Sequence, residues 1–181
     1  VNVALNDSAL QIGETATVTF TFSEAPTGFA ANDVTVQNGN LSAVTATGNP
    51  LIFNATFTPT ADTEDATNVI SVGTGYTDAA GNTGTAGVSA NYTIDTLAPT
   101  VAVTLDDSAL KIGDTATVTF SFSEVPTGFA AGDVTAQNGN LSAFTATGNP
   151  LIFTATFTPT ADTEDATNVI SVGTGYTDAV G

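Results

Sequence analysis

The chain contains one sequence twice, and this duplication restricts its fold more than any other feature. Residues 1–81 recur as residues 101–181 at a constant offset of 100 residues without a gap, and 69 of the 81 aligned positions are identical. The period is well above the roughly 20 to 50 residues of solenoid repeats, so each copy can enclose a hydrophobic core of its own. We therefore predict two tandem domains.

The predicted domains cover residues 1–95 and 101–181, and a linker of residues 96–100 joins them. The second copy ends at the counterpart of Gly81, so it lacks the last strand, and we expect further repeats in a longer parent chain. The linker is too short to act as a free tether. Pro99 fixes its own φ and favours extended backbone at the residue before it, so we expect the domains to meet end to end.

Alternation of apolar and polar residues predicts the secondary structure. Along residues 15–22 every second residue is apolar and the others are threonines, which is the pattern of a half-buried antiparallel strand. No stretch has the spacing of an amphipathic helix. Turn signals such as Asn38-Gly39 separate the candidate strands. We predict seven strands in the first repeat, at residues 1–5, 15–22, 33–37, 41–47, 51–57, 68–73 and 88–94.

Seven short alternating strands in about 95 residues are typical of an immunoglobulin-like sandwich. The predicted fold is therefore all-β, with tandem immunoglobulin-like antiparallel β-sandwiches arranged end to end and about seven strands in each repeat. An antiparallel barrel is the alternative architecture.

Composition excludes several classes of function. The chain has 18 acidic residues and one basic residue, Lys111, for a net charge of −17, so nucleic acids and anionic membranes are poor partners. It contains no Cys, His, Met or Trp, which removes thiolate and imidazole nucleophiles and soft-metal ligands. No apolar run is long enough to cross a membrane. We predict that the protein is not an enzyme, does not insert into membranes and has no small-molecule substrate.

The order of the predicted strands sorts the acidic loops to two ends of each domain. Strands that run alternately down and up place the first inter-strand loop, the fifth inter-strand loop and the end of the last strand together at the bottom. They place the second and sixth loops at the top, beside the incoming linker. The bottom acids are Asp7, Glu14, Asp62, Glu64, Asp65 and Asp95, and the top group is Glu24, Asp33, Asp78 and Asn82.

Carboxylates that gather without basic partners favour a bound cation. Two of them about 4 Å apart repel by roughly 4 kcal/mol at an effective dielectric constant of 20. Ca²⁺ accepts six to eight oxygen ligands in irregular geometry, so it suits loop-built sites better than Mg²⁺ does. The alternative is that the acids are solvated and keep the protein soluble. The candidate metal ligands are Glu14, Glu24, Asp33, Asp62, Glu64, Asp65, Asp78, Asn82, Asp95, Glu124, Asp133 and Asp178.

We expect Ca²⁺ chiefly at the junction of the two repeats. There we expect Glu14, Asp62, Glu64, Asp65 and Asp95 of the first repeat to approach Glu124, Asp133 and Asp178 of the second, and the bound Ca²⁺ to fix the angle between the domains. We also expect further ions among the loops at each end of a domain, with Asp78 and Asn82 as the first candidate ligands.

Four runs follow one another in a fixed order along the first repeat and the linker: FSEAPTGF at residues 22–29, NDVTVQNG at 32–39, YTDAAGN at 76–82 and IDTLAPT at 94–100. Together they resemble the bacterial immunoglobulin-like repeats of giant Ca²⁺-dependent RTX adhesins. The resemblance implies secretion by a Gram-negative bacterium and retention at the cell surface. It also implies long arrays, rigidified by Ca²⁺ in the linkers, that hold distal ligand-binding domains for biofilm formation or for attachment, to ice in one case. The glycine-rich nonapeptide of RTX proteins is absent from the chain.

These expectations together predict that the chain is a structural extender, or spacer, of a cell-surface adhesin. The spacer binds Ca²⁺ and contacts only neighbouring repeats of its own chain. We expect such a spacer to be monomeric. The main alternative is a module that binds carbohydrate or another cell surface. Homophilic adhesion through exposed sheet edges is a third possibility.

Overall fold

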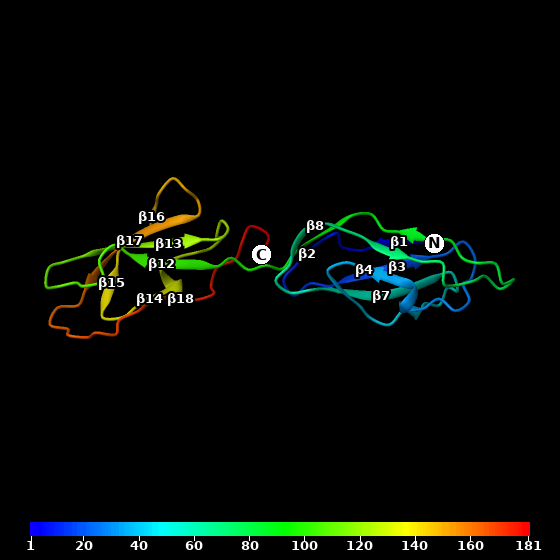
Figure 1. The fold of residues 1–181 in the computed structure, drawn as a ribbon, viewed down its shortest axis with the longest axis horizontal. Coiled ribbons are helices and arrows are strands. Elements are labelled where there is room, and N and C mark those ends of the chain that lie inside the picture. Colours follow the sequence, from blue (N-terminus) through cyan, green and yellow to red (C-terminus); the bar gives the residue numbers. More distant parts are fainter. The chain divides into compact units, whose positions relative to one another are not determined.

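The computed structural model describes all 181 residues, and the chain divides into two compact units (Figure 1): unit 1, Val1–Leu97, and unit 2, Ala98–Gly181. Apart from two short 3-10 helices, η1 (Ala31–Asp33) and η2 (Ala131–Asp133), all regular structure is β-strand. Neither helix has the length and apolar character needed to cross a lipid bilayer. The prediction of an all-β fold is confirmed.

Unit 1 is a sandwich of two β layers. The first layer has the order β1-β3-β7-β5, with β6 also paired to β7, and all of its pairings are antiparallel. The second layer consists of two short sheets, β10-β9-β4 and β2-β11-β8, in which only the β2–β11 pairing is parallel. The strands are β1 (Asn2–Leu5), β2 (Ala9–Gln11), β3 (Ala16–Thr21), β4 (Val34–Val36), β5 (Gly39–Leu41), β6 (Thr45–Ala46), β7 (Ile52–Pro59), β8 (Glu64–Asn68), β9 (Ile70–Val72), β10 (Gly87–Val88) and β11 (Tyr92–Asp95).

This strand order is that of an immunoglobulin-like sandwich. If β5 with β6, β8 with β9, and β10 with β11 are each taken as one interrupted strand, the seven strands A to G form the layers A-B-E-D and C-F-G. The short strand β2 adds a parallel neighbour to strand G. The predicted immunoglobulin-like sandwich is confirmed.

The core lies between the two layers and follows the predicted alternation. On β3, Ala16, Val18 and Phe20 are fully buried, whereas the threonines between them face outward. The facing layer contributes Leu10, Ile70, Val72, Tyr92 and Ile94. Each fully buried side chain of this size contributes about 1.5–3 kcal/mol through removal of apolar surface from water. The alternating pattern therefore identifies the residues that hold the layers together.

Four local features differ from the prediction. The strand β2 was not predicted, and the strand expected at residues 41–47 is divided between β5 and β6. The strand expected at 68–73 begins earlier, at Glu64, as β8. Val88 is 61% exposed, although the alternating pattern placed it in the core. Strand G is interrupted there because the hydroxyl oxygen of Ser89 accepts a bond from the Ile70 N–H and donates one to the carbonyl of Ala90.

Unit 2 repeats the first layer of unit 1 and part of the second. Its larger sheet has the order β12-β13-β17-β15, with β16 also paired to β17, and its smaller sheet is the pair β14-β18. It has no counterpart of β2, β8, β10 or β11. The strands are β12 (Val101–Leu105), β13 (Ala116–Phe122), β14 (Val134–Ala136), β15 (Gly139–Leu141), β16 (Thr145–Ala146), β17 (Ile152–Pro159) and β18 (Ile170–Val172).

Two identical segments therefore adopt different structures in the two units. Glu64–Asn68 forms β8, whereas Glu164–Asn168 forms no strand. Asn68 is fully buried, but Asn168 is exposed and the adjacent Val169 is 57% exposed. β8 pairs with β11, whereas Glu164–Asn168 pairs with no strand. Strand formation here depends on cross-strand contacts rather than on intrinsic propensity.

The buried Tyr92 gives unit 1 a specific dependence on alkaline pH. Burial raises the pKa of Tyr92 to about 12, from an ordinary value of 10.0. The folded protein therefore holds the phenol proton more tightly than the unfolded chain does. The contribution of Tyr92 to stability is complete below pH 10 and is lost as the pH rises toward 12. Urea denaturation at a series of pH values should show unit 1 losing stability in this window. The Tyr92→Phe variant should lose less, and equal losses in both proteins would contradict the assignment.

Candidate functional site

The loops of unit 1 gather at two ends, as the strand order predicted. A hollow of about 260 Å³ is lined by Val1, by Glu24 of the loop between β3 and β4, and by Asp78 and Asn82 of the loop between β9 and β10. A second hollow, of about 170 Å³, is lined by Glu14, Ala61 and Thr96, among others. Glu24, Asp78 and Asn82 of the top group therefore lie at one hollow, and Glu14 of the bottom group lies at the other.

At the top of unit 1, Asp78 organises its own loop. Its Oδ1 accepts bonds from the backbone N–H groups of Ala80 and Asn82, both at 2.8 Å, and its Oδ2 accepts one from Asn82 Nδ2 at 2.7 Å. Gly81 has a φ of +87°, a left-handed conformation that favours glycine. The bonds from Asn82 are the main cause of a pKa of Asp78 below its usual range. The predicted pair Asp78 and Asn82 is thus in contact, and the contact closes the loop.

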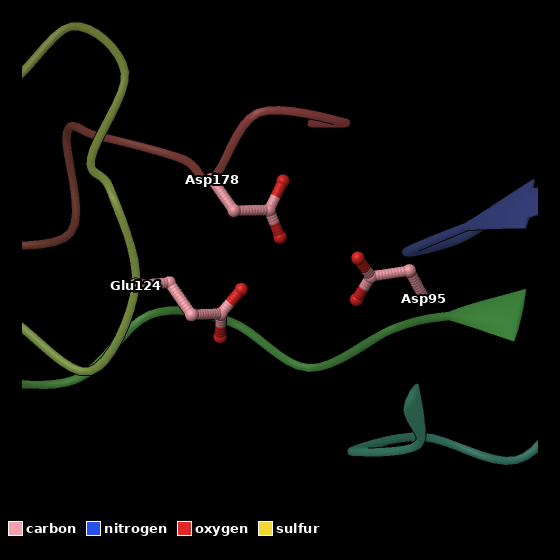
Figure 2. Close-up of side chains that lie close together, drawn as sticks. All are labelled: Asp95, Glu124 and Asp178. Atoms are coloured by element: carbon pink, nitrogen blue, oxygen red, sulfur yellow. The ribbon is translucent and has the colours of Figure 1, made fainter. Parts of the chain in front are cut away.

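Unit 2 contains two acids, Glu124 and Asp178, that correspond to Glu24 and Asp78 of unit 1 (Figure 2). Their side chains extend from two different loops toward a common space, and their carboxylate oxygens lie within 4.8 Å of one another. Asp178 Oδ1 also accepts the backbone N–H groups of Val180 and Gly181, at 2.7 and 2.8 Å. These bonds fix the Asp178 carboxylate in place.

Electrostatics makes this pair suitable for a cation. Two carboxylates at such a separation repel by about 3 kcal/mol at an effective dielectric constant of 20. Lys111 is the only basic side chain in the chain, and it lies in a different loop, between β12 and β13. An acidic cluster of this kind could bind a metal ion. Carboxylate ligands favour the hard cations Ca²⁺ and Mg²⁺ over softer metals.

Asp33 and Asp133 have a structural role in their loops. Each lies at the end of a 3-10 helix, where its Oδ2 accepts the backbone N–H of Ala30 or Ala130, at 2.9 and 2.8 Å. The backbone carbonyl of each accepts a bond from Gly73 or Gly173. Asp133 does not belong to the carboxylate group that contains Glu124 and Asp178. The predicted top cluster is therefore smaller than expected.

Glu64 and Asp65 lie in β8, so their predicted placement in a loop is wrong. The chain becomes a strand before Asn68 because β11 is available as a partner. Asp65 accepts bonds from the Thr67 N–H at 2.8 Å and from Asn38 Nδ2 at 2.7 Å. The Thr67 bonds are the main cause of a pKa of Asp65 below its usual range. Asp65 thus anchors the turn at Asn38.

The other bottom acids of unit 1 do not form a carboxylate cluster among themselves. Glu14 accepts the N–H of Gln11 at 2.9 Å, and Asp62 adopts a positive φ of +53°. Glu64 is directly opposite Asp95 in the β8–β11 register. Like charges directly opposite one another on paired strands are destabilising. Asp95 is thus an acid in an unfavourable local position at the end of unit 1.

Hydrogen bonds hold each end of the linker to its own unit, and sequence reasoning missed them. In unit 1, the Thr96 hydroxyl donates to Thr60 O at 2.7 Å, and the Thr96 N–H donates to Thr63 O at 2.8 Å. In unit 2, the Thr100 N–H donates to Ser123 Oγ at 2.9 Å, and the Ser123 N–H donates to Thr100 O, also at 2.9 Å. Threonine and serine are frequent throughout the chain, so their number gave no signal of these roles.

Comparison with known protein families matches residues 1–94 and, separately, residues 95–181 to the bacterial Ig-like domain. Domains of this kind are typical of bacterial surface or secreted proteins and are usually non-catalytic. Comparison with curated proteins found no match. The two matches together cover the whole chain, and they agree with the two sandwiches seen in the structure. The chain therefore belongs to the bacterial Ig-like domain family and consists of two tandem copies of that domain.

Proposed function

We propose that the chain is a structural extender segment of a bacterial cell-surface adhesin. In this proposal, Ca²⁺ at the junction between consecutive repeats restricts their relative motion, and the resulting stiff array projects a distal ligand-binding domain. The protein is secreted, remains at the surface of a Gram-negative cell and acts as a monomer. Its partners are the neighbouring repeats of the same chain.

The anchored linker is the observation that carries the proposal. Thr96 is bonded to unit 1 and Thr100 to unit 2, and only residues 97–99 lie between these two anchors. One of these three is Pro99, whose ring restricts φ. From Thr96 to Thr100 the backbone can span at most about 15 Å. A connection this short limits how far the two domains can separate, so a single bound ion can restrict what freedom remains.

The acidic residues next to the linker supply the proposed ligands. Ser123, which is bonded to Thr100, directly precedes Glu124, and Glu124 is paired with Asp178. Asp95 directly precedes the anchor Thr96. We assign Asp95 as the third carboxylate of the proposed Ca²⁺ site, completed by backbone carbonyls and water. Ca²⁺ fits this donor set better than Mg²⁺, because Mg²⁺ requires a near-ideal octahedron and retains its water.

The acids of unit 1 that correspond to Glu124 and Asp178 are Glu24 and Asp78, and both line one hollow at the top of that unit. In an array of such repeats, each domain would therefore present two carboxylates to the last strand of the domain before it. The expected affinity is on the order of 10⁻⁴ to 10⁻³ M, as for Ca²⁺ sites in other extracellular modules.

Small-angle X-ray scattering tests the extender directly. With millimolar Ca²⁺, the 181-residue chain should scatter as a rigid, elongated monomer. EDTA should reduce the maximum dimension and give the scattering of two flexibly joined bodies. The Asp95→Asn variant should resemble the EDTA state even in Ca²⁺. Identical profiles with and without Ca²⁺ would contradict the proposal, and saturable binding of glycans or cells would favour an adhesion module instead.

A further inference from the structure

The turn between β4 and β5 of unit 1 contains the dipeptide Asn38-Gly39, and the fold restricts both of its residues. Asn38 has a φ of +50°, in the left-handed region where asparagine is one of the few side chains that occur often. A Cβ atom at residue 39 would collide with the ring of Phe57 and would lie 2.6 Å from the carbonyl oxygen of Thr58. Residue 39 must therefore be glycine.

The side-chain amide of Asn38 joins this turn to β8. Its Nδ2 donates to Asp65 Oδ2 at 2.7 Å and to Asn68 Oδ1 at 2.8 Å. Asn68 is fully buried, and its own Nδ2 donates to the backbone carbonyls of Asp65 and Tyr92, at 2.9 and 3.3 Å. Both partners of Asn38 therefore present acceptor oxygens. An aspartate at residue 38 would tolerate the backbone, but its carboxylate would offer these acceptors no donor.

The Asn38-Gly39 dipeptide is also chemically labile. In such a sequence the glycine nitrogen can approach the side-chain carbonyl carbon of the asparagine, because glycine has no Cβ to obstruct the approach. Asn38 is exposed, and its carbonyl oxygen accepts the N–H of Thr60 on the neighbouring strand at 2.9 Å. The next pair in the register, Gly39 and Pro59, is therefore a non-hydrogen-bonded pair, so the Gly39 N–H points away from β7. The attacking nitrogen is free of the sheet, whereas β8 holds the amide that it would attack.

We propose that Asn38 is a site of spontaneous deamidation and that the opening of β8 triggers the reaction. When Asp65 and Asn68 release the amide, the Gly39 nitrogen attacks Cγ of Asn38. A C–N bond forms, the Cγ–Nδ2 bond breaks, and ammonia leaves with the proton of the Gly39 amide. Water then opens the resulting succinimide at one of its two carbonyl carbons, which gives aspartate or isoaspartate. Water is the only reactant besides the chain, and no electrons are transferred.

The reaction makes the opening of β8 permanent. In either product a carboxylate replaces the amide donor, so the acceptor oxygens of Asp65 and Asn68 lose their partner and the Asp65 carboxylate gains a like charge nearby. Isoaspartate also adds one methylene group to the backbone next to Gly39, where Phe57 leaves no space for a side chain. Because β8 pairs with β11, the modification converts a transient local opening of unit 1 into a lasting loss of contacts along this edge.

Mass spectrometry of the full 181-residue chain tests the proposal. After incubation in mildly alkaline buffer, peptic fragments that contain residue 38 should show the mass change from an amide to an acid and should contain isoaspartate. Val36 and Val44 identify these fragments, because unit 2 has alanine and phenylalanine at the corresponding positions. The reaction should be at least tenfold faster in denaturing urea, which releases β8. Asn40 is exposed on the same strand but precedes leucine, so it should not react and serves as the internal control.

Two adjacent acids of β8 provide a matched pair of variants for the folded chain. Asp65→Ala removes an acceptor of the Asn38 amide and should accelerate the reaction at least fivefold. Glu64→Ala changes an exposed side chain that makes no bond to Asn38, so it should not accelerate the reaction. Amide hydrogen exchange at residues 16–21 of β3 should stay slow in both variants, which distinguishes the opening of β8 from loss of the fold.

The Asn38→Asp variant imitates one product and tests the consequence of the reaction. Amide hydrogens at residues 64–68 should exchange at least tenfold faster in this variant than in the wild type, and those at residues 16–21 should not. Four results would overturn the proposal: no modification of Asn38 in urea, equal rates in the folded and denatured chain, equal rates in Asp65→Ala and Glu64→Ala, or wild-type exchange in Asn38→Asp.

Discussion

Replacement of Tyr92 by alanine is expected to reduce the free energy of unfolding of unit 1 by about 3–5 kcal/mol, the usual cost of truncating a large buried aromatic side chain. Tyr92 is 1% exposed, its ring packs edge-on against Phe57, and its hydroxyl donates to Gln37 O at 3.1 Å. It also pairs with Asn68 in the β11–β8 register. Loss of the ring should leave a cavity and release β8.

Urea denaturation followed by tyrosine fluorescence or circular dichroism measures this effect, and we expect the two domains to unfold in separate transitions. Only the transition of unit 1 should move to lower urea. The Tyr92→Phe variant keeps the ring and removes one hydrogen bond, so its cost should be about 1 kcal/mol. Hydrogen exchange in Tyr92→Ala should become faster at residues 64–68. A loss below 1 kcal/mol for alanine, or an equal loss in both units, would show that β11 does not hold the sandwich together in this way.

The second large effect is expected from Ca²⁺ itself. A ligand at 10 to 100 times its dissociation constant stabilises the state that binds it by about 1.4 to 2.7 kcal/mol. For affinities between 10⁻⁴ and 10⁻³ M, 10 mM Ca²⁺ provides this range. In a domain of 60–100 residues, each kcal/mol shifts the melting temperature by about 4–8 °C. We therefore expect Ca²⁺ to raise the melting temperature of unit 2 by roughly 6–20 °C relative to EDTA.

Differential scanning calorimetry of three proteins tests this expectation. The double variant Glu124→Gln and Asp178→Asn should lose the Ca²⁺-dependent shift. The charge-matched control Asp162→Asn and Glu164→Gln changes two exposed acids elsewhere in unit 2 and should retain the shift. If the control loses as much as the double variant, Ca²⁺ acts by general screening of negative charge. A wild-type chain that melts at the same temperature in Ca²⁺ and in EDTA would contradict the proposed site.

Much of the fold could be predicted because its signals are local. The apolar alternation along β3 and β7 reflects burial on one face of a sheet, and the duplication shows directly that there are two domains. The start of β8 could not be predicted, because it depends on a partner about 30 residues away. The identical residues 164–168 without a strand are the evidence for this dependence. The break in the strand at Ser89 could not be predicted either, because the sequence does not show which hydrogen bonds a serine makes across the sheet.

The candidate site could be predicted in outline. Sorting the loops by end brought Glu24 near Asp78, and the repeat extended that pairing to Glu124 and Asp178. The same sorting overestimated the clusters, because composition does not distinguish an acid that could bind a cation from one that accepts backbone N–H groups. Asp33 and Asp65 are of the second kind, and their donors become visible only in three dimensions.

The most direct test of the Ca²⁺-stiffened junction is isothermal titration calorimetry of Ca²⁺ into the full chain and into its Asp95→Asn variant. Asparagine keeps the size of the side chain and removes one charge at the end of unit 1. The proposal predicts a wild-type site with a dissociation constant on the order of 10⁻⁴ to 10⁻³ M. It also predicts at least tenfold weaker binding in Asp95→Asn, comparable to the loss in Glu124→Gln. Equal affinity and stoichiometry in the wild type and Asp95→Asn would contradict a site shared between the repeats.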